Sequence, residues 1–189
     1  MDQALILASA SPRRQELLRE AGIRFAAHPP HVPEERGSGE LPLAYAQRLA
    51  LEKAQAVARD FPRRYVLGAD TIVVVDDEVL EKPRDAADAA RMLRRLSGRG
   101  HSVTTAVSLV SPEERLDTRY ATTQVFFRRI EEQEISDYVA GGEPMDKAGA
   151  YAIQGGAARW TERIEGEYSN VVGLPLSLVK EMLRANGFR

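Results

Sequence analysis

The sequence contains no cysteine in 189 residues. This absence excludes disulfides, thiolate nucleophiles and cysteine-based zinc sites, and it fits a reducing compartment, so we expect a cytoplasmic protein. Long apolar runs are also missing. The late stretch VVGLPLSLV is interrupted by Pro175 and is far shorter than the roughly 20 residues that span a bilayer. The start, MDQALILASAS, lacks the basic region of a signal peptide, and we therefore expect no membrane partner.

A strong charge of either sign is absent as well. The chain has 26 Lys and Arg against 28 Asp and Glu, a formal net charge of -2. No overall basic field attracts nucleic acid, so we expect no nucleic-acid partner, and any anion site must be local. With 43% hydrophobic residues, the chain is long enough for a sizeable core. We expect a single domain over residues 1–189, or two small lobes that share a sheet.

Strand and helix patterns are interspersed along the chain, which predicts a mixed α/β fold. ALILAS predicts a strand, followed by a helix from Pro12 to Ala21 with Ser11 as its N-cap. An amphipathic helix is expected over 42–60, with Lys53 off its apolar stripe. Further strands are predicted in IRFAAHP, HSVTTAVSLV, RLDTRYATTQVFFRRI and ARWTERIEG, and further helices over 85–98, 131–140 and 175–186. YVLGADTIVVVDDEVL predicts a strand pair with an acidic turn at Asp76 and Asp77.

The stretch ASASPRRQELL places Arg13 and Arg14 on the first turn of a helix. Like charges at this positive end of the helix dipole cost a few tenths to ~1 kcal/mol each. The same backbone N–H groups favour an anion, and arginine suits phosphate oxygens. Two interpretations stay open: solvated arginines, or a phosphate site. The sequence has neither GxxxxGK[ST] nor GxGxxG, so it is not a usual P-loop or dinucleotide fold.

Two carboxylates are candidates for chemistry. Asp70, in GADT, follows an apolar strand segment. It is either a strand-end or bulge aspartate satisfied by backbone donors, or a partly buried carboxylate that takes a proton from water or helps hold a divalent cation. Glu34, in the irregular loop PPHVPEERGSGELP, either reaches a metal or is solvated.

Two lysines and a glutamine complete the candidates. Lys53 could lie on a helix surface, whereas Lys82 sits between an extended segment and a proline in EKP. Together with the two arginines they match the charge of a triphosphate. Gln154, in DKAGAYAIQGGA, offers an amide that donates and accepts among small residues, or is a surface glutamine in a tight turn.

Four separated motifs, LILASASPRRQELL, GADTIVVVDDEVLEKP, DKAGAYAIQG and IEGEYSNVVGLPL, stand in an order that resembles the Maf family of nucleoside triphosphate pyrophosphatases. The resemblance spans Leu5 to Leu183. It implies hydrolysis of a nucleoside triphosphate between the α- and β-phosphates with Mg²⁺ or Mn²⁺. It also implies a Maf/ITPase-like α/β fold, with an elongated mixed sheet flanked by helices, two lobes and a central cleft, in a homodimer.

The resemblance also implies roles for single residues. Asp70 matches the proton acceptor that activates water, and Asp70 with Glu34 matches the acidic positions near the metal. The polar and basic residues of the phosphate site are matched by Ser9, Arg14, Lys53 and Lys82.

Base preference in the family divides at three positions, occupied in this sequence by Arg13, Thr71 and Gln154. The combination is similar to the branch that acts on dTTP and UTP. The branch that prefers 7-methyl-GTP has an aromatic residue, a glutamine and a glutamate there. Two alternatives stay beside the leading interpretation: a 7-methyl-GTP pyrophosphatase, and a nucleotide-binding regulator of septum formation without turnover.

Overall fold

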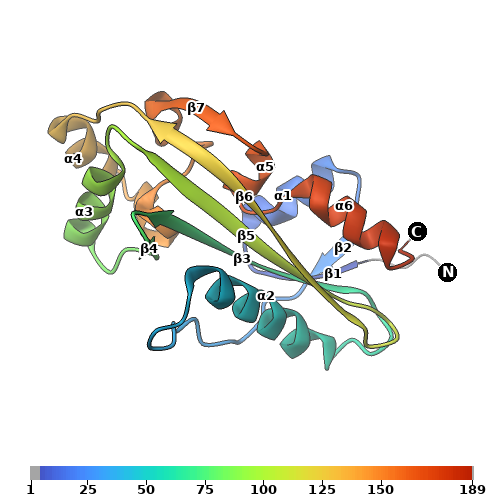
Figure 1. Ribbon diagram of the computed structural model, residues 1–189. Helices are drawn as coiled ribbons and strands as arrows, with labels where there is room; N and C mark the ends of the chain where they lie inside the picture. The colour runs from blue at the N-terminus through green and yellow to red at the C-terminus, as the bar shows by residue number, and fades with distance from the viewer. Residues whose placement is uncertain (1–4, 189) are drawn as a thin grey trace. The chain divides into compact units, whose positions relative to one another are not determined.

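The computed structural model of the chain describes residues 5–188 (Figure 1). Over these residues one sheet contains β1 (Leu5–Ala8), β2 (Phe25–Ala27), β3 (Val66–Val75), β4 (Glu78–Leu80), β5 (Gly100–Val110), β6 (Leu116–Phe127) and β7 (Thr161–Glu165). The strand order is β2-β1-β3-β5-β6-β7, and β4 pairs with β3. β1 runs parallel to β2 and β3, whereas β4 is antiparallel to β3 and β7 is antiparallel to β6. The sheet is therefore mixed.

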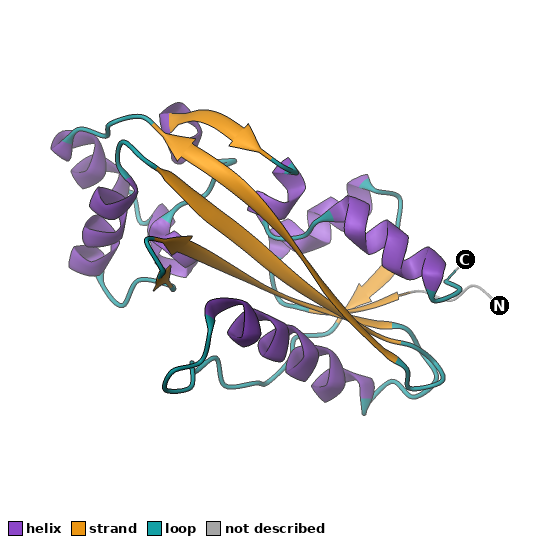
Figure 2. Ribbon diagram, viewed as in Figure 1, coloured by secondary structure: helices purple, strands orange, loops and turns teal. Residues whose placement is uncertain are grey.

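Six α-helices and three short 3-10 helices occur in the described residues. The α-helices are α1 (Pro12–Glu20), α2 (Pro42–Ala58), α3 (Ala86–Leu96), α4 (Glu132–Ala140), α5 (Tyr168–Val172) and α6 (Leu176–Ala185). The 3-10 helices are η1 (Glu143–Asp146), η2 (Ala148–Ala150) and η3 (Gly156–Trp160). Helices and strands are interspersed along the chain and both are present in the structure (Figure 2), which confirms the predicted mixed α/β class.

The chain divides into two compact units. Unit 1 comprises the described residues up to Asp70, Thr105–Ala121 and the segment from Gly173 onward. Unit 2 comprises Thr71–Thr104 and Thr122–Val172. The strands β3, β5 and β6 each contribute residues to both units. The two units agree in number with the two expected lobes, and the single domain over 1–189 stays a prediction.

The start of α1 forms as the sequence predicts. The Ser11 hydroxyl accepts a hydrogen bond from the backbone N–H of Arg14 at 3.4 Å, and Pro12 is the first helical residue. Proline suits that position because its missing N–H has no partner within the helix. Beyond the helix, Gly22 adopts a φ of +70°, which glycine tolerates without strain and which lets the chain turn into β2.

In unit 1, α2 packs small side chains directly on the strands. Figure 1 shows α2 on one side of these strands and α1 with α6 on the other. A Cβ on Gly68 would lie 2.7 Å from the backbone nitrogen of Ala54, and closer still to the carbonyl oxygen of Ala50. Glycine at this position of β3 therefore allows the backbones of helix and strand to touch. The core cluster beside this contact contains Ile6, Ala8, Ala54, Val57, Val66 and Val110.

In unit 2, a group of rings fills the core. His101 lies edge-on to Phe127 and to Tyr151, with ring centroids 4.9 and 5.4 Å apart. Trp160 is fully buried and lies edge-on to Phe127 and to Tyr138. The hairpin of β3 and β4 turns at Asp76 and Asp77, as predicted, and both residues have positive φ.

The sequence analysis missed the shortest elements. The glycine-rich tract after α4 holds η1, η2 and η3, which were not predicted. The expected strand ARWTERIEG begins only at Thr161, because residues 156–160 form η3, and α5 was also missed. Elements of three to five residues carry no hydrophobic period, and hydrogen bonds in single turns decide them.

Candidate functional site

The centre of the candidate site is a buried lysine between two carboxylates of unit 1. The Nζ atom of Lys53 lies 2.7 Å from Oδ1 of Asp70 and 2.7 Å from Oε1 of Glu34. Lys53 comes from α2, Asp70 from β3, and Glu34 from the loop before α2. Lys53 and Asp70 are both buried, whereas the Glu34 side chain is 39% exposed. The ammonium group therefore joins an interior carboxylate to one that reaches solvent.

The position of Lys53 corrects the sequence analysis, which placed it off the apolar stripe of the helix. The structure puts it on the buried face of α2, with Leu49, Ala50, Ala54 and Val57. A lysine can occupy that face because its charge is compensated by two carboxylates within hydrogen-bond distance. The interpretation of Lys53 as a surface residue is wrong.

Asp70 also differs from the simplest expectation. It lies within β3, four residues after the strand begins, and not at a strand end. Its carboxylate accepts a hydrogen bond from the Lys53 ammonium. It is thus a buried carboxylate held by the lysine ammonium, and its role as proton acceptor or metal ligand stays a prediction.

Arg14 is fixed beside this centre by backbone carbonyl groups. Its Nε donates to the carbonyl of Gly173 at 2.8 Å, and its Nη1 donates to the carbonyl of Ala69 at 3.0 Å. Burial lowers the pKa of the guanidinium, and the negative charges of Asp70 and Glu34 oppose that shift. Arg14 therefore lies within the electrostatic field of the two carboxylates. Its acceptor Ala69 directly precedes Asp70 on β3.

Ser9 links the end of β1 to α1. It is buried, and its hydroxyl accepts hydrogen bonds from the backbone N–H of Ser11 at 3.1 Å and from Nη1 of Arg14 at 3.5 Å. Arg13, on the same first turn, is half-buried. The helix start thus presents two arginines beside a buried hydroxyl, as a phosphate site would need.

Five of the predicted site residues lie together in unit 1, joined by hydrogen bonds, ion pairs and electrostatic interactions, and three others belong to unit 2. The five are Ser9, Arg14, Glu34, Lys53 and Asp70. In unit 2, Thr71 is half-buried in β3, whereas Lys82, after β4, and Gln154, between η2 and η3, are exposed. The roles assigned to all of these residues stay predictions.

The sequence analysis did not single out Gly173 or Ala69, whose carbonyl groups hold Arg14. A main-chain acceptor leaves no side-chain signal. The one available hint was the glycine in YSNVVGLP, and Gly173 adopts a φ of +130° that other residues rarely tolerate.

Two carboxylates are the candidate ligands for the divalent cation that the family resemblance implies. Glu34 and Asp70 converge on Lys53 Nζ and offer the hard carboxylate oxygens that Mg²⁺ and Mn²⁺ prefer. Within residues 5–188, no group of three or more His, Asp or Glu side chains could hold a metal by itself. Mg²⁺ commonly uses one or two carboxylates together with phosphate oxygens of the substrate, so the residues fit a cation that arrives with a triphosphate.

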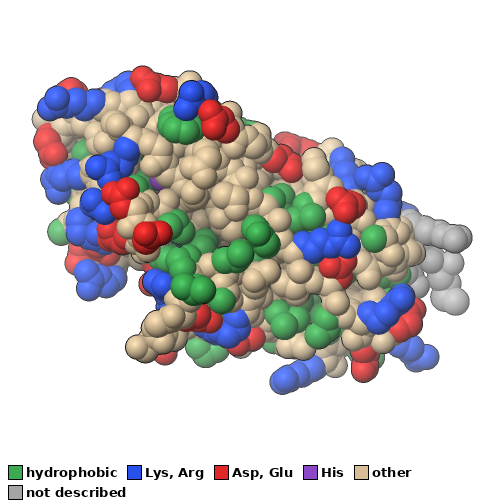
Figure 3. All heavy atoms as spheres, in the orientation of Figure 1, with side chains coloured by type: hydrophobic (Ala, Val, Ile, Leu, Met, Phe, Trp, Pro, Cys, Tyr) green, Lys and Arg blue, Asp and Glu red, His purple; other side chains and the backbone are tan. Residues whose placement is uncertain are grey.

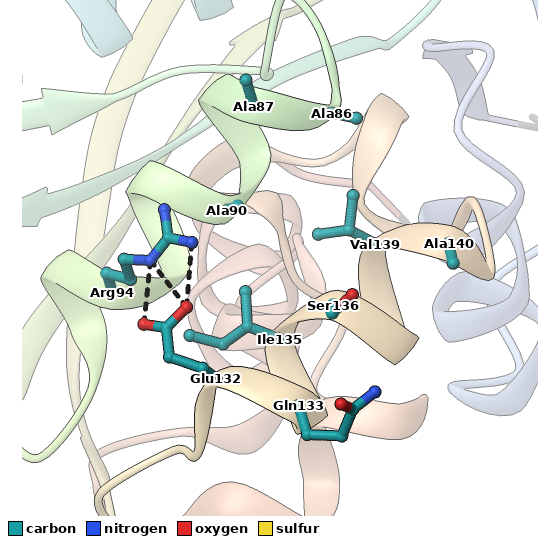
Figure 4. Close-up of a pocket in the computed structure, with 10 residues that line it drawn as sticks. All are labelled: Ala86, Ala87, Ala90, Arg94, Glu132, Gln133, Ile135, Ser136, Val139 and Ala140. Carbon is teal, nitrogen blue, oxygen red and sulfur yellow. Dashed lines mark hydrogen bonds and ion pairs between the residues drawn. The ribbon is translucent and has the colours of Figure 1, made fainter.

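A separate open pocket of about 640 Å³ lies in unit 2, between α3 and α4 (Figure 4). Small side chains such as Ala86 and Ala90 line it, and the ion pair of Arg94 with Glu132 lies at its edge. No predicted site residue lines this pocket. On the molecular face drawn in Figure 3, acidic and basic side chains alternate, so that face carries no broad basic patch. In the part of the chain that the structure describes, no helix is long and apolar enough to cross a bilayer.

The fold and the family follow from comparison with known proteins. The fold is similar to that of the Staphylococcus aureus Ham1 protein, with a TM-score of 0.56 and 12% identity over 97% of this chain and 99% of that chain. This similarity defines the class of fold, the Ham1-like mixed α/β proteins. The family profile described as Maf-like protein matches residues 4–186. The chain belongs to the Maf family, which confirms the resemblance drawn from the four motifs.

Curated relatives match nearly the whole chain. A Koribacter versatilis protein named dTTP/UTP pyrophosphatase is 57% identical over 188 residues, which are 99% of this chain and 96% of the relative. A Citrifermentans bemidjiense protein of the same name is 51% identical over 187 residues, 98% of this chain and 97% of the relative.

Proposed function

We propose that this protein is a nucleoside triphosphate pyrophosphatase that converts dTTP and UTP to the monophosphate and pyrophosphate. The observation that carries the proposal is the placement of Arg14, Lys53 and Asp70 around one point of unit 1. The names of relatives at 57% and 51% identity support the same reaction and the same bases.

In the proposed reaction, Asp70 accepts the proton of an attacking water. The water oxygen forms a bond to the α-phosphorus, the bond from that phosphorus to the α,β-bridging oxygen breaks, and pyrophosphate leaves with the bonding electrons. Lys53 binds Oδ1 of Asp70 and so fixes the orientation of the carboxylate, with Oδ2 as the proton-accepting atom.

The cations stabilise charge that builds up on the phosphate oxygens during this step. Arg14 is already oriented by backbone carbonyl groups, so little reorganisation is needed when the triphosphate binds. We also assign phosphate binding to Ser9, Lys53 and Lys82, as the family resemblance implies. Asp70 and Glu34 would hold Mg²⁺ or Mn²⁺, which when bound withdraws charge from the phosphate oxygens.

We assign base selection to Arg13, Thr71 and Gln154. A glutamine amide both donates and accepts, so it can pair with the N3–H donor and the carbonyl acceptor of uracil and thymine. A glutamate in this position would favour a base that presents donors, as the 7-methyl-GTP branch has. We further propose that the protein is cytoplasmic and forms a homodimer, as expected from the sequence. Light scattering of the purified protein measures its molar mass in solution and so distinguishes a dimer from a monomer.

The proposal is tested by incubating the pure protein with dTTP, UTP or 7-methyl-GTP and Mg²⁺, then separating the products. We expect monophosphate and pyrophosphate from dTTP and UTP. Release of orthophosphate would contradict the mechanism, preferred cleavage of 7-methyl-GTP would indicate the other branch, and binding without turnover would indicate a regulator.

The role of Asp70 is tested by Asp70→Asn, which keeps the shape of the side chain and removes the base. We expect turnover to be abolished while urea unfolding stays cooperative. Asp117→Asn is the matched control, because Asp117 also belongs to unit 1 and binds an arginine, Arg119, at 2.9 Å. Full activity of Asp70→Asn would reject its assignment as the proton acceptor.

A further inference from the structure

Gln154 lies in a loop of six residues, Tyr151–Gly156, which we call the Gln154 loop. Gln154 is exposed, whereas its neighbour Ile153 is 5% exposed and Tyr151 is 6% exposed. The loop therefore has buried side chains on one side of Gln154 and presents the glutamine to solvent. An exposed side chain can select a base only if the backbone beneath it is held in place.

Two side chains outside the loop hold that backbone. The Tyr138 hydroxyl accepts a hydrogen bond from the backbone N–H of Ala152 at 3.1 Å. The Glu143 carboxylate accepts a hydrogen bond from the backbone N–H of Gly156, at 3.2 Å to Oε1 and 3.3 Å to Oε2. These two N–H groups lie two residues before and two residues after Gln154.

The two side chains also bind each other. The hydroxyl of Tyr138 donates to Oε1 of Glu143 at 2.7 Å, so one continuous hydrogen-bond chain runs from Ala152 to Gly156. A hydroxyl that donates to a carboxylate becomes a better acceptor, because hydrogen bonds in a chain polarise one another. Bonds to an ionised acceptor are also stronger than bonds between neutral groups.

Both holding residues are themselves fixed. Tyr138, on α4, is 6% exposed, and its ring lies edge-on to Trp160 with centroids 4.8 Å apart. Glu143 is the first residue of η1, and its backbone carbonyl accepts a hydrogen bond from Nζ of Lys147 at 2.6 Å. A Cβ on Gly155 would lie within 2.6 Å of the carboxyl carbon of Glu143, so the loop backbone rests directly on that carboxyl group.

From this geometry we infer that Tyr138 and Glu143 are positioning residues that set base selectivity by holding the Gln154 loop at both ends. The inference rests on the proposed function, because it takes Gln154 as the residue that pairs with the base. It assigns to this pair no contact with the nucleotide. All of the groups belong to unit 2, so the clamp operates within one compact part of the chain.

The inference is tested with Tyr138→Phe, which removes only the hydroxyl and keeps the ring against Trp160. UTP is compared with CTP, since cytosine presents a donor and an acceptor where uracil presents an acceptor and a donor. The variant frees the backbone N–H of Ala152, and the loss of that one hydrogen bond in a partly buried network corresponds to roughly 5–30-fold in an equilibrium. We expect kcat/KM for UTP to fall by that factor, chiefly through KM, with a smaller fall for CTP, so that the UTP-to-CTP ratio drops.

Tyr65→Phe is the matched control. Tyr65 is also 6% exposed, and its hydroxyl donates to the carbonyl of Asn186 at 2.7 Å, in unit 1. Each variant loses one hydroxyl, which makes two hydrogen bonds in Tyr138 and one in Tyr65. We therefore expect the urea midpoint to fall in both, at least as far in Tyr138→Phe, but the UTP-to-CTP ratio to change only in Tyr138→Phe. Glu143→Gln is a second variant that keeps the shape and lowers the charge on the acceptor, and it should shift the ratio in the same direction.

The same ratio is measured without turnover, as the Kd values of α,β-methylene analogues of UTP and CTP. Failure of the proposed function appears as absence of pyrophosphate release by the unaltered protein, whereas failure of this inference appears as an unchanged Kd ratio in Tyr138→Phe. The double variant Tyr138→Phe/Gln154→Ala supplies the final arm. We expect it to match the ratio of Gln154→Ala alone; additive losses, or an unchanged ratio in Gln154→Ala, would overturn the inference.

Discussion

Arg14 and Gly173 lie 159 positions apart in the sequence and are joined by a hydrogen bond. The Nε of Arg14 donates to the backbone carbonyl of Gly173 at 2.8 Å. The arginine belongs to the motif ASASPRRQELL and the glycine to the motif YSNVVGLPL. Two of the four family motifs thus meet at one hydrogen bond. The second motif contributes a backbone carbonyl to this bond and not a side chain.

This relationship predicts a loss of activity from a change in backbone alone. Gly173→Ala forces an L-residue to a φ of +130°, at a cost of about 1–3 kcal/mol if the conformation is kept. If the backbone relaxes, the carbonyl leaves Arg14. We expect kcat/KM for UTP to fall more than for the control Gly22→Ala, which also has positive φ but open space around it. Equal activities of the two variants would contradict the role of Gly173.

The pair of Lys53 and Asp70 predicts a non-additive effect on stability. Lys53→Met leaves a buried carboxylate without its cation, which costs about 3–5 kcal/mol in comparable sites. We expect the free energy of unfolding, measured in urea, to fall by about that amount, against little change for the exposed control Lys180→Met. The double variant Lys53→Met/Asp70→Asn should be more stable than Lys53→Met alone, and a double variant of lower stability would refute the pairing argument.

Gly68 predicts a packing defect directly beneath the candidate site. A methyl group there meets the backbone of α2, which has no rotamer with which to move away. Gly68→Ala should lower the free energy of unfolding by about 1–3 kcal/mol, the usual cost of overpacking, and should also separate Lys53 from Asp70. Gly37→Ala is the control, because its new Cβ would meet only the flexible side chain of Glu40 at 3.5 Å or more. Similar urea midpoints for the two variants would disprove the close approach.

The burial of His101 predicts that the free energy of unfolding falls in mild acid. The ring is 2% exposed, Nε2 lies 2.8 Å from the Tyr151 hydroxyl, and Nδ1 has no hydrogen-bond partner among the described residues. Burial lowers the pKa of His101 from 6.5 to about 4. The unfolded chain therefore takes up a proton as the pH falls below about 6.5, while the folded chain does not until near pH 4, and stability is lost across this window.

The expected loss is about 2 kcal/mol between pH 7.5 and pH 5, from urea unfolding at the two values. This range lies above the ordinary pKa of 4.5, near which the glutamates of the unfolded chain take up protons. Carboxylates whose pKa values are held low by arginines in the folded chain, such as Glu40 and Glu134, therefore keep most of their contribution to stability. His101→Leu removes the titrating group, so its stability should change much less over the same range. An equally steep dependence in that variant would assign the effect to other groups.

Sequence reasoning succeeded where the determinants are local. Ser11 and Pro12 start α1 by hydrogen bonding and ring geometry within four residues, and Asp76 with Asp77 forms the turn between β3 and β4. The same reasoning identified Asp70 as a candidate because it follows an apolar strand segment, and Lys53 because the two lysines and two arginines match the charge of a triphosphate. Their pairing needs β3 and α2 to meet, which no local pattern encodes.

The features that were missed depend on contacts between distant segments. Lys53 was predicted off the buried stripe of α2 because a charged side chain is expected in solvent. Its burial depends on the ion pairs with Glu34 and Asp70, which the pattern of the helix does not reveal. Tyr138 and Glu143 were not identified at all, since each looks like an ordinary helix or turn residue until Ala152 and Gly156 fold onto them. Hydrogen bonds to backbone N–H groups are invisible to any analysis that compares side chains.

The division of the strands between the two units has a consequence for synthesis of the chain. Unit 2 is complete once Val172 has been made, whereas unit 1 requires the segment from Gly173 onward, which includes α6. During synthesis, unit 1, which contains Asp70 and Lys53, therefore has all of its segments later than unit 2. Its first strand, β1, is nevertheless made before any part of unit 2. Of the two carbonyl groups that hold Arg14, that of Ala69 is made early and that of Gly173 only after all of unit 2. The guanidinium can therefore be held at both points only once residue 173 has emerged.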